Sequence, residues 1–196
     1  QMMKQMYHKE YSEILNIFYG IHVSVVTKLN SNDVLSTHPE PFSVINLPLP
    51  NIATPTIYDC FDCYCCKEAL VGNNKYEMEN KEKVDAEKGI IFWSLPNVLI
   101  LDLKRWRRGG NKIHTNVRAP ITNADFSKYV KGYAPEQYVY DLYGVCNHSG
   151  GTLGGHYVAC VKNANGCWYE FNDTSVKQIS ETSIISSNTY CFFYRK

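Results

Sequence analysis

The spacing of apolar residues predicts both helices and strands in the first part of the chain. Apolar side chains recur with helical spacing over residues 7–18, which predicts a helix that ends before Gly20. Alternation and β-branched residues predict strands over residues 22–29 and 42–49. A second helix is predicted over residues 56–70, before a segment of glycine and asparagine.

The second half of the chain is dominated by short runs of β-favouring residues that Gly, Asn or Pro separate. Because these runs follow one another without long helices, we expect an α+β fold with a mostly antiparallel sheet and few helices. A single helical turn is predicted over residues 180–185, and a hairpin turn over residues 107–111. The predicted strands cover residues 90–93, 97–106, 113–119, 138–147, 156–162, 167–171 and 190–194.

The composition is ordinary for a soluble globular protein, with 44% apolar and 20% charged residues among 196. A net charge of +1 gives no overall field that would attract nucleic acid or an anionic membrane, so we expect neither as a partner. The most apolar stretch, residues 90–103, is interrupted by Pro96 and Asp102, which is not typical of a membrane span. Eight cysteines without a secretory signal favour reduced thiols in the cytoplasm or nucleus.

The most informative stretch places a histidine after a glycine-rich segment, within residues 140–176. His156 stands at the start of a predicted strand, where the sheet anchors it and the glycine-rich side leaves it reachable. One hairpin later, Asn172 and Asp173 end a strand, where a side-chain acceptor could hold the imidazole Nδ1–H. This arrangement is typical of the base and the orienting residue of a nucleophilic triad. A structural or surface histidine is the alternative that the spacing alone leaves open.

Three motifs follow one another in an order that points to one family. Residues 40–50 contain Glu-Pro-Phe and Leu-Pro, residues 93–106 contain Leu-Pro and Leu-x-Leu-Lys-Arg-Trp, and residues 140–176 contain Tyr-x-Leu-Tyr-x-Val, Gly-His-Tyr and Asn-Asp. The chain resembles the ubiquitin-specific proteases in these motifs, over residues 18–196. The resemblance implies the palm and fingers of the papain-like cysteine protease superfamily.

The resemblance also implies a role for each residue of the histidine motif. His156 matches the general base that takes the proton of a thiol, and Asn172 matches the residue that orients it. Asp173 matches a neighbouring acidic position that assists or substitutes for Asn172. The implied reaction is hydrolysis of the bond after the C-terminal glycine of ubiquitin, so ubiquitin or a ubiquitinated protein is the expected partner.

A second set of residues matches family positions near the channel for the ubiquitin tail. A tail that ends in two glycines requires a narrow channel with backbone partners and aromatic walls. Residues 149–154 match a flexible loop that lies over this tail. For Trp106, a plain core aromatic is an equally good interpretation. The residues expected to bind substrate are Arg105, Trp106, His148 and Tyr157.

The sequence departs from the family at the nucleophile. The family's Gly-Asn-Thr-Cys-Tyr box, which also builds the oxyanion hole, does not occur, and none of the eight cysteines has that context. We therefore expect residues 1–196 to form a partial catalytic domain whose thumb lobe is largely missing. Either another segment or chain supplies the thumb and its cysteine, or the protein is a catalytically dead module that only binds ubiquitin.

The zinc site that many family members carry at the fingertips is expected to be lost. The matching positions, residues 27–31 and 76–80, contain no cysteine, and Lys28 cannot bind zinc as a cation. We therefore expect no cofactor. A replacement zinc site on the second predicted helix is less favoured than buried structural thiols. Its four cysteines would be Cys60, Cys63, Cys65 and Cys66.

Overall fold

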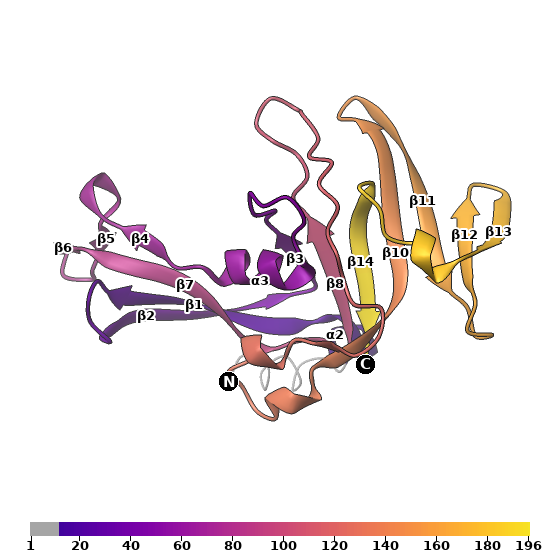
Figure 1. The fold of residues 1–196 in the computed structure, drawn as a ribbon. Coiled ribbons are helices and arrows are strands. Elements are labelled where there is room, and N and C mark those ends of the chain that lie inside the picture. The colour runs from indigo at the N-terminus through magenta and orange to yellow at the C-terminus, as the bar shows by residue number, and fades with distance from the viewer. Residues whose placement is uncertain (1–11) are drawn as a thin grey trace. The chain divides into compact units, whose positions relative to one another are not determined.

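The computed structural model describes residues 12–196, which divide into two compact units (Figure 1). The helix predicted over residues 7–18 lies partly outside the described residues, and its described part is α2 (Glu13–Phe18). Each unit is assembled from three separate stretches of chain. The first unit contains the described residues up to Ser43, Cys65–Asn97 and Ser127–Tyr138, and the second contains Val44–Tyr64, Val98–Phe126 and Val139–Lys196.

The first unit is built on a four-stranded antiparallel sheet with the order β2-β1-β7-β4. Phe42 and Phe92 are buried in this unit, with 5.5 Å between their ring centroids. A hairpin of β5 with β6 and three 3-10 turns belong to the same unit. The bounds are β1 (Gly20–Lys28), β2 (Val34–Phe42), β4 (Glu68–Leu70), η1 (Gly72–Asn74), β5 (Tyr76–Glu77), β6 (Lys83–Val84), β7 (Ala86–Ser94), η2 (Ser127–Tyr129) and η3 (Pro135–Gln137).

Strand β2 was not predicted, because Pro39 and Pro41 are unfavourable inside a sheet. The structure accommodates both prolines because β2 is the edge strand, which pairs only with β1. The strand predicted over residues 42–49 is divided between the units. β2 ends at Phe42 in the first unit, and β3 (Val44–Leu47) lies in the second.

The second unit is built on an eight-stranded sheet with the order β13-β12-β11-β10-β14-β8-β3, and β9 pairs with β10 outside this path. Only the pair of β3 with β8 is parallel among the described strands, which confirms the prediction of a mostly antiparallel α+β fold. The bounds are β8 (Val98–Leu103), β9 (Ala124–Asp125), β10 (Val139–Gly151), β11 (Gly154–Lys162), β12 (Trp168–Asn172), β13 (Ser175–Ile179), η4 (Glu181–Ser183) and β14 (Thr189–Arg195).

The core of the second unit forms between one face of this sheet and the helix α3 (Ile57–Cys65). Alternate residues of β8 are fully buried, as expected for a strand with one face on the core. Phe126 joins helix to sheet, since its ring lies 4.8 Å from Phe61 of α3 and 5.8 Å from Tyr194 of β14. None of the described helices is long and apolar enough to span a membrane.

Four local predictions can be compared with this structure. The hairpin turn at residues 107–111 is confirmed, since Trp106 and Lys112 pair across it and Gly109 and Gly110 adopt the positive φ angles that favour glycine. The helical turn near residue 182 is confirmed as η4. The strand over residues 113–119 was wrong, because this segment is irregular. The helix over residues 56–70 was too long, because residues 68–70 pair with β7 as β4.

One acidic group is buried at a cost in the second unit. Asp102 of β8 pairs in register with Cys191 of β14, and its Oδ1 atom is buried without a hydrogen-bond partner among the described residues. Burial raises the pKa of this carboxyl to about 6, against the smaller opposing effects of the Leu103 backbone and Lys104. The folded protein therefore binds the Asp102 proton more tightly than the unfolded chain does.

We expect Asp102→Asn to stabilise the protein at pH 7.5, where the wild-type carboxyl is ionised. Because the group is partly exposed, the expected gain in the free energy of unfolding is about 1–2 kcal/mol. The gain should shrink as the pH falls from 6 towards 4, since the wild-type carboxyl is then protonated in the fold. Denaturant unfolding at several pH values measures this, with the exposed Asp33→Asn as the control. A gain that does not depend on pH would contradict the interpretation.

Candidate active site

The β10–β11 hairpin positions the histidine motif. The two strands pair in register from Gly144 with Val161 to Gly151 with Gly154, so that only Thr152 and Leu153 form the turn. The sequence predicted a flexible loop over residues 149–154, whereas the structure continues the ladder to the tip of the hairpin (Figure 1). The histidine therefore lies on a regular strand, two residues after the beginning of β11.

His156 is hydrogen-bonded to the residue predicted to orient it. Its Nε2 atom lies 2.7 Å from Oδ1 of Asn172, at the end of β12. Because this oxygen can only accept, Nε2 must carry the proton. The motif predicted a contact through Nδ1, whereas the structure has it through Nε2, and Nδ1 has no hydrogen-bond partner among the described residues. With its side chain 47% exposed, His156 offers the Nδ1 lone pair to an approaching proton donor.

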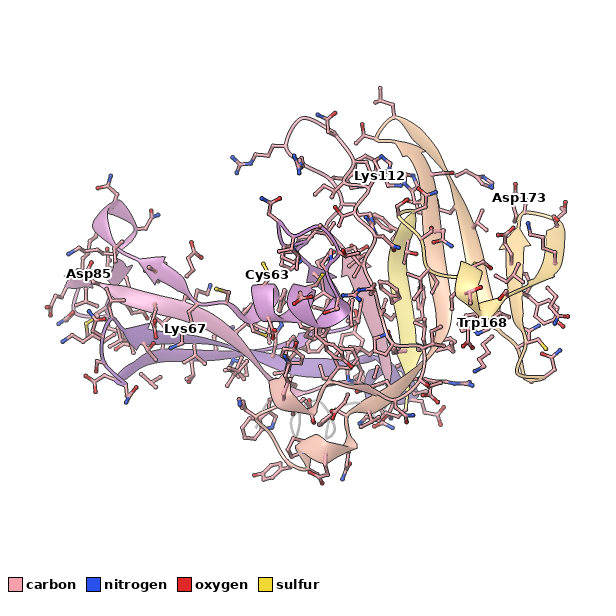
Figure 2. All side chains as sticks on the ribbon, viewed as in Figure 1. Cys63, Lys67, Asp85, Lys112, Trp168 and Asp173 are labelled. Atoms are coloured by element: carbon pink, nitrogen blue, oxygen red, sulfur yellow. The ribbon has the colours of Figure 1, made fainter. Side chains whose placement is uncertain are left out.

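Asp173 lies farther from the imidazole than Asn172 does. One carboxylate oxygen of Asp173 is 4.0 Å from Nε2 of His156, and its side chain is 78% exposed. The residue sits in the tight turn between β12 and β13, where its φ angle is +49°, a conformation that aspartate tolerates better than most residues (Figure 2). At this distance Asp173 makes no hydrogen bond to the imidazole.

An aromatic cluster occupies the sheet near the same hairpin. His148 of β10 is only 3% exposed, and its ring centroid lies 4.6 Å from that of Tyr157 and 5.7 Å from that of Trp106. Tyr190 of β14 completes the cluster, 5.9 Å from His148. Three of the four residues predicted to bind substrate therefore lie together. Tyr157 is 56% exposed and presents its ring to solvent.

Lys112 joins this cluster, although the sequence gave no reason to single it out. Its Nζ atom lies 3.0 Å from Nδ1 of His148 and also donates to the His148 carbonyl oxygen. Burial, and then the charge of Lys112, lower the pKa of His148. His148 is thus kept as a neutral imidazole. Tyr190 was also missed, because only its place in the sheet, beside His148, makes it part of the cluster.

The chain is similar to known proteins in sequence and in fold. The family model described as ubiquitin carboxyl-terminal hydrolase matches residues 2–194. The chain belongs to this family. Among the curated relatives, ubiquitin carboxyl-terminal hydrolase 31 from Homo sapiens is 34% identical over 170 residues, which cover 73% of this chain and 13% of that protein. Ubiquitin carboxyl-terminal hydrolase 9 from Arabidopsis thaliana is 35% identical over 170 residues, covering 84% and 18%.

Solved structures share the fold of this chain. A chain in the structure of the yeast SAGA DUB module with an Sgf73 mutant superposes with a TM-score of 0.81 at 26% identity, over 99% of this chain and 44% of that one. A DUB module with Ubp8, Sgf11, Sus1 and Sgf73 gives the same TM-score. The chain spans less than a fifth of the two curated relatives and less than half of these structural neighbours.

Arg105 is fully buried and leaves no surface for direct contact with a substrate in this conformation. Its Nε atom donates to the carbonyl oxygen of Thr189 at 2.6 Å, and its Nη1 atom donates to those of Ile113 and Thr115 at 2.8 Å. Burial lowers the pKa of its guanidinium. Arg105 therefore ties the irregular segment after the hairpin turn to the beginning of β14.

The described cysteines are all free, and none of them is hydrogen-bonded to His156. Burial raises the pKa of Cys60 and of Cys191 to about 12, and also raises the pKa of Cys146 and Cys160. These four thiols are therefore held in the protonated, weakly nucleophilic form. Cys60 lies in the core of the second unit on α3, which fits a structural role for that thiol.

The fingertip positions lie in the first unit. Residues 27–31 span the end of β1 and the turn towards β2, and residues 76–80 begin the β5–β6 hairpin. The backbone amide of Leu29 donates to the carbonyl of Asp85 at 3.0 Å, so a hydrogen bond joins the first of these places to the residue that follows β6. Among the described residues no group of three or more His, Cys, Asp or Glu side chains is arranged to hold a metal ion.

We expect Gly155→Ala to destabilise the hairpin, because a Cβ atom there would lie 2.2 Å from Nε2 of His148 and 2.7 Å from the carbonyl oxygen of Ser149. The loss in the free energy of unfolding should be about 1–3 kcal/mol. The neighbouring Gly154→Ala is the matched control, since a Cβ atom there meets nothing within 4 Å. Denaturant unfolding of both variants measures the difference. Equal losses would show that His148 does not pack over Gly155 in solution.

Proposed function

We propose that this chain supplies the general base and its orienting residue to a thiol-dependent deubiquitinase, which hydrolyses the bond after the C-terminal glycine of ubiquitin. The observation that carries the proposal is the hydrogen bond from Nε2 of His156 to Asn172, which directs the basic Nδ1 away from its orienting partner. This is the geometry that a nucleophilic thiol requires of its base. The family membership supports the class of reaction.

In the proposed mechanism the imidazole moves one proton in each of two steps. Nδ1 of His156 takes the proton of a cysteine thiol, and the thiolate attacks the carbonyl carbon of the terminal glycine. The imidazolium then returns the proton to the leaving amine, which leaves an acyl-enzyme thioester. Water hydrolyses the thioester with His156 again acting as base. Asn172 keeps the ring oriented throughout without adding a negative charge, and Asp173 stabilises the imidazolium through its charge.

The nucleophile in this proposal is not one of the eight cysteines of the chain. The four thiols with raised pKa values are poor nucleophiles, and no described cysteine is hydrogen-bonded to His156. A thumb segment, on another chain or elsewhere in the same protein, would carry the thiol. Residues 1–196 are then a partial catalytic domain that contributes palm and fingers.

The substrate contacts follow from the aromatic cluster. Tyr157 is the exposed member, and its ring would form a wall of the channel for the glycines of the ubiquitin tail. His148 packs against the ring of Tyr157, and Trp106 packs against His148 in the same cluster. The proposed partner is ubiquitin or a ubiquitinated protein. The thiol chemistry fits a reducing compartment, the cytoplasm or nucleus.

The absence of a cysteine beside His156 among the described residues favours a second candidate function. In that case the protein binds ubiquitin without cleaving it. The same exposed aromatic surface would serve, but His156 would have no proton to accept.

A ubiquitin probe with a C-terminal electrophile separates the two functions. We expect the full-length protein to form a covalent adduct, and His156→Ala to slow its formation by about 10²–10⁴-fold, because the thiol then lacks its base. Mass spectrometry measures the adduct over time. His114→Ala is the matched control, since His114 is exposed in the same unit. Tight, reversible binding of the probe without an adduct would support the binding module.

We also propose that the fingers contain no structural zinc, because Lys28 stands among the matching positions and cysteines do not. Metal analysis of the purified protein tests this. A stoichiometric zinc content would contradict the proposal.

A further inference from the structure

Lys112 is held in a defined place beside the aromatic cluster. It follows the hairpin turn of residues 107–111, and its backbone pairs with Trp106 across that turn. Its ammonium nitrogen lies 3.0 Å from Nδ1 of His148 and 6.0 Å from the centroid of the Trp106 ring, and it also donates to the carbonyl oxygen of His148 (Figure 2). One cation thus contacts two members of the cluster and the backbone of β10.

This contact decides which nitrogen of His148 carries the proton. An ammonium group has three donors and no acceptor, so Nδ1 of His148 must be the acceptor in the Lys112 hydrogen bond. The proton of the neutral ring is then on Nε2. Nε2 lies on the side of the ring that faces the hairpin backbone at Gly155, next to His156. The Nε2–H group therefore points towards the strand that carries the candidate base.

We propose that Lys112 is a positioning residue, which acts on the substrate channel by fixing the tautomer and the orientation of the His148 ring. The inference rests on the proposed function, since the channel is the one assigned there to the ubiquitin tail. Lys112 does not contact the substrate in this proposal. It holds His148, and the His148 ring, 4.6 Å from that of Tyr157, holds the exposed wall of the channel.

The surroundings of His148 explain why a cation is suited to this task. The side chains that face the ring are Lys112, Trp106, Tyr157 and Tyr190, and none of them is a carboxylate. The ring is almost fully buried, so an Nδ1 atom without a donor would lose both water and a partner. Burial, and then the charge of Arg105, lower the pKa of Lys112. The charged side chain in contact with the buried ring is thus a cation, which favours the neutral form of the ring.

Removing the donor should have effects that a loss of packing alone does not produce. In Lys112→Met the alkyl chain is kept, whereas the hydrogen bond and the charge are lost. Lys112→Gln keeps a donor, through its side-chain amide, but loses the charge. If the hydrogen bond sets the tautomer of His148, Lys112→Gln preserves that tautomer and Lys112→Met does not. If the charge also keeps the ring neutral, the pKa of His148 should rise in both variants.

Nuclear magnetic resonance of ¹⁵N-histidine-labelled full-length protein measures both properties, with the His148 signal assigned from His148→Gln. We expect the wild type to show a proton on Nε2 and to remain neutral below pH 6.5, because burial and Lys112 both lower the pKa. Lys112→Met should show a mixture of tautomers and a higher pKa, whereas Lys104→Met, an exposed control, should match the wild type.

Kinetics with a fluorogenic ubiquitin substrate give the functional readout. Lys112→Met should raise KM about tenfold, because one hydrogen bond to a positioned group is lost. It should change kcat much less. Lys112→Gln should recover most of the KM. An unchanged tautomer and KM in Lys112→Met would overturn the proposal, and so would equal effects of Met and Gln on the tautomer. If the wild type does not cleave ubiquitin, the proposed function fails, while the tautomer measurement still decides the role of Lys112.

Discussion

The antiparallel pairing of β11 with β10 on one side and with β12 on the other is the constraint on which the site depends. The first pairing sets Ser149 opposite His156, and so fixes where the imidazole leaves the strand. The second sets Ala159 opposite Phe171, which brings the end of β12 beside that imidazole. A slip of one residue in either pairing would turn the side chains to the other face and separate His156 from Asn172.

The second unit combines this ladder with polar groups that a simple hydrophobic core would not contain. The buried Arg105 donates to three backbone carbonyls through its Nε and Nη1 atoms, and its Nη2 atom has no hydrogen-bond partner among the described residues. Thr189, whose carbonyl accepts from Arg105, donates its hydroxyl to Asn147 of β10, and Asn147 lies 3.5 Å from the Cys160 sulfur of β11. A continuous polar connection thus runs from the segment after the hairpin turn into the strand of the candidate base. Such a connection specifies one arrangement of the strands.

The sequence predicted the strands near the site well and the connections poorly. The runs that became β10, β11, β12 and β14 are rich in aromatic and β-branched residues, so their propensity and their final structure agree. Residues 113–119 have a similar composition but do not form a strand, because Arg105 binds the carbonyls of Ile113 and Thr115 instead of a neighbouring strand. That long-range contact cannot be read from local spacing.

The same distinction holds for the candidate site. The pairing of His156 with Asn172 was predicted from the motif, whereas the nitrogen involved depends on the direction in which the ring leaves β11. Trp106, His148 and Tyr157 come together as predicted, and their roles in binding ubiquitin stay predictions. Lys112 and Tyr190 had no signal in the sequence, because they approach His148 from strands and turns that are distant along the chain.

The prolines of β2 also determine how the first unit meets other molecules. Pro39 and Pro41 are two positions apart, so their nitrogen atoms lie on the same side of the strand, and neither can donate a hydrogen bond. Because β2 pairs only with β1, the two prolines remove two donors from a strand that has a neighbour on one side only. Proline on an edge strand disfavours its pairing with an extended segment from another copy and so protects against edge-to-edge aggregation.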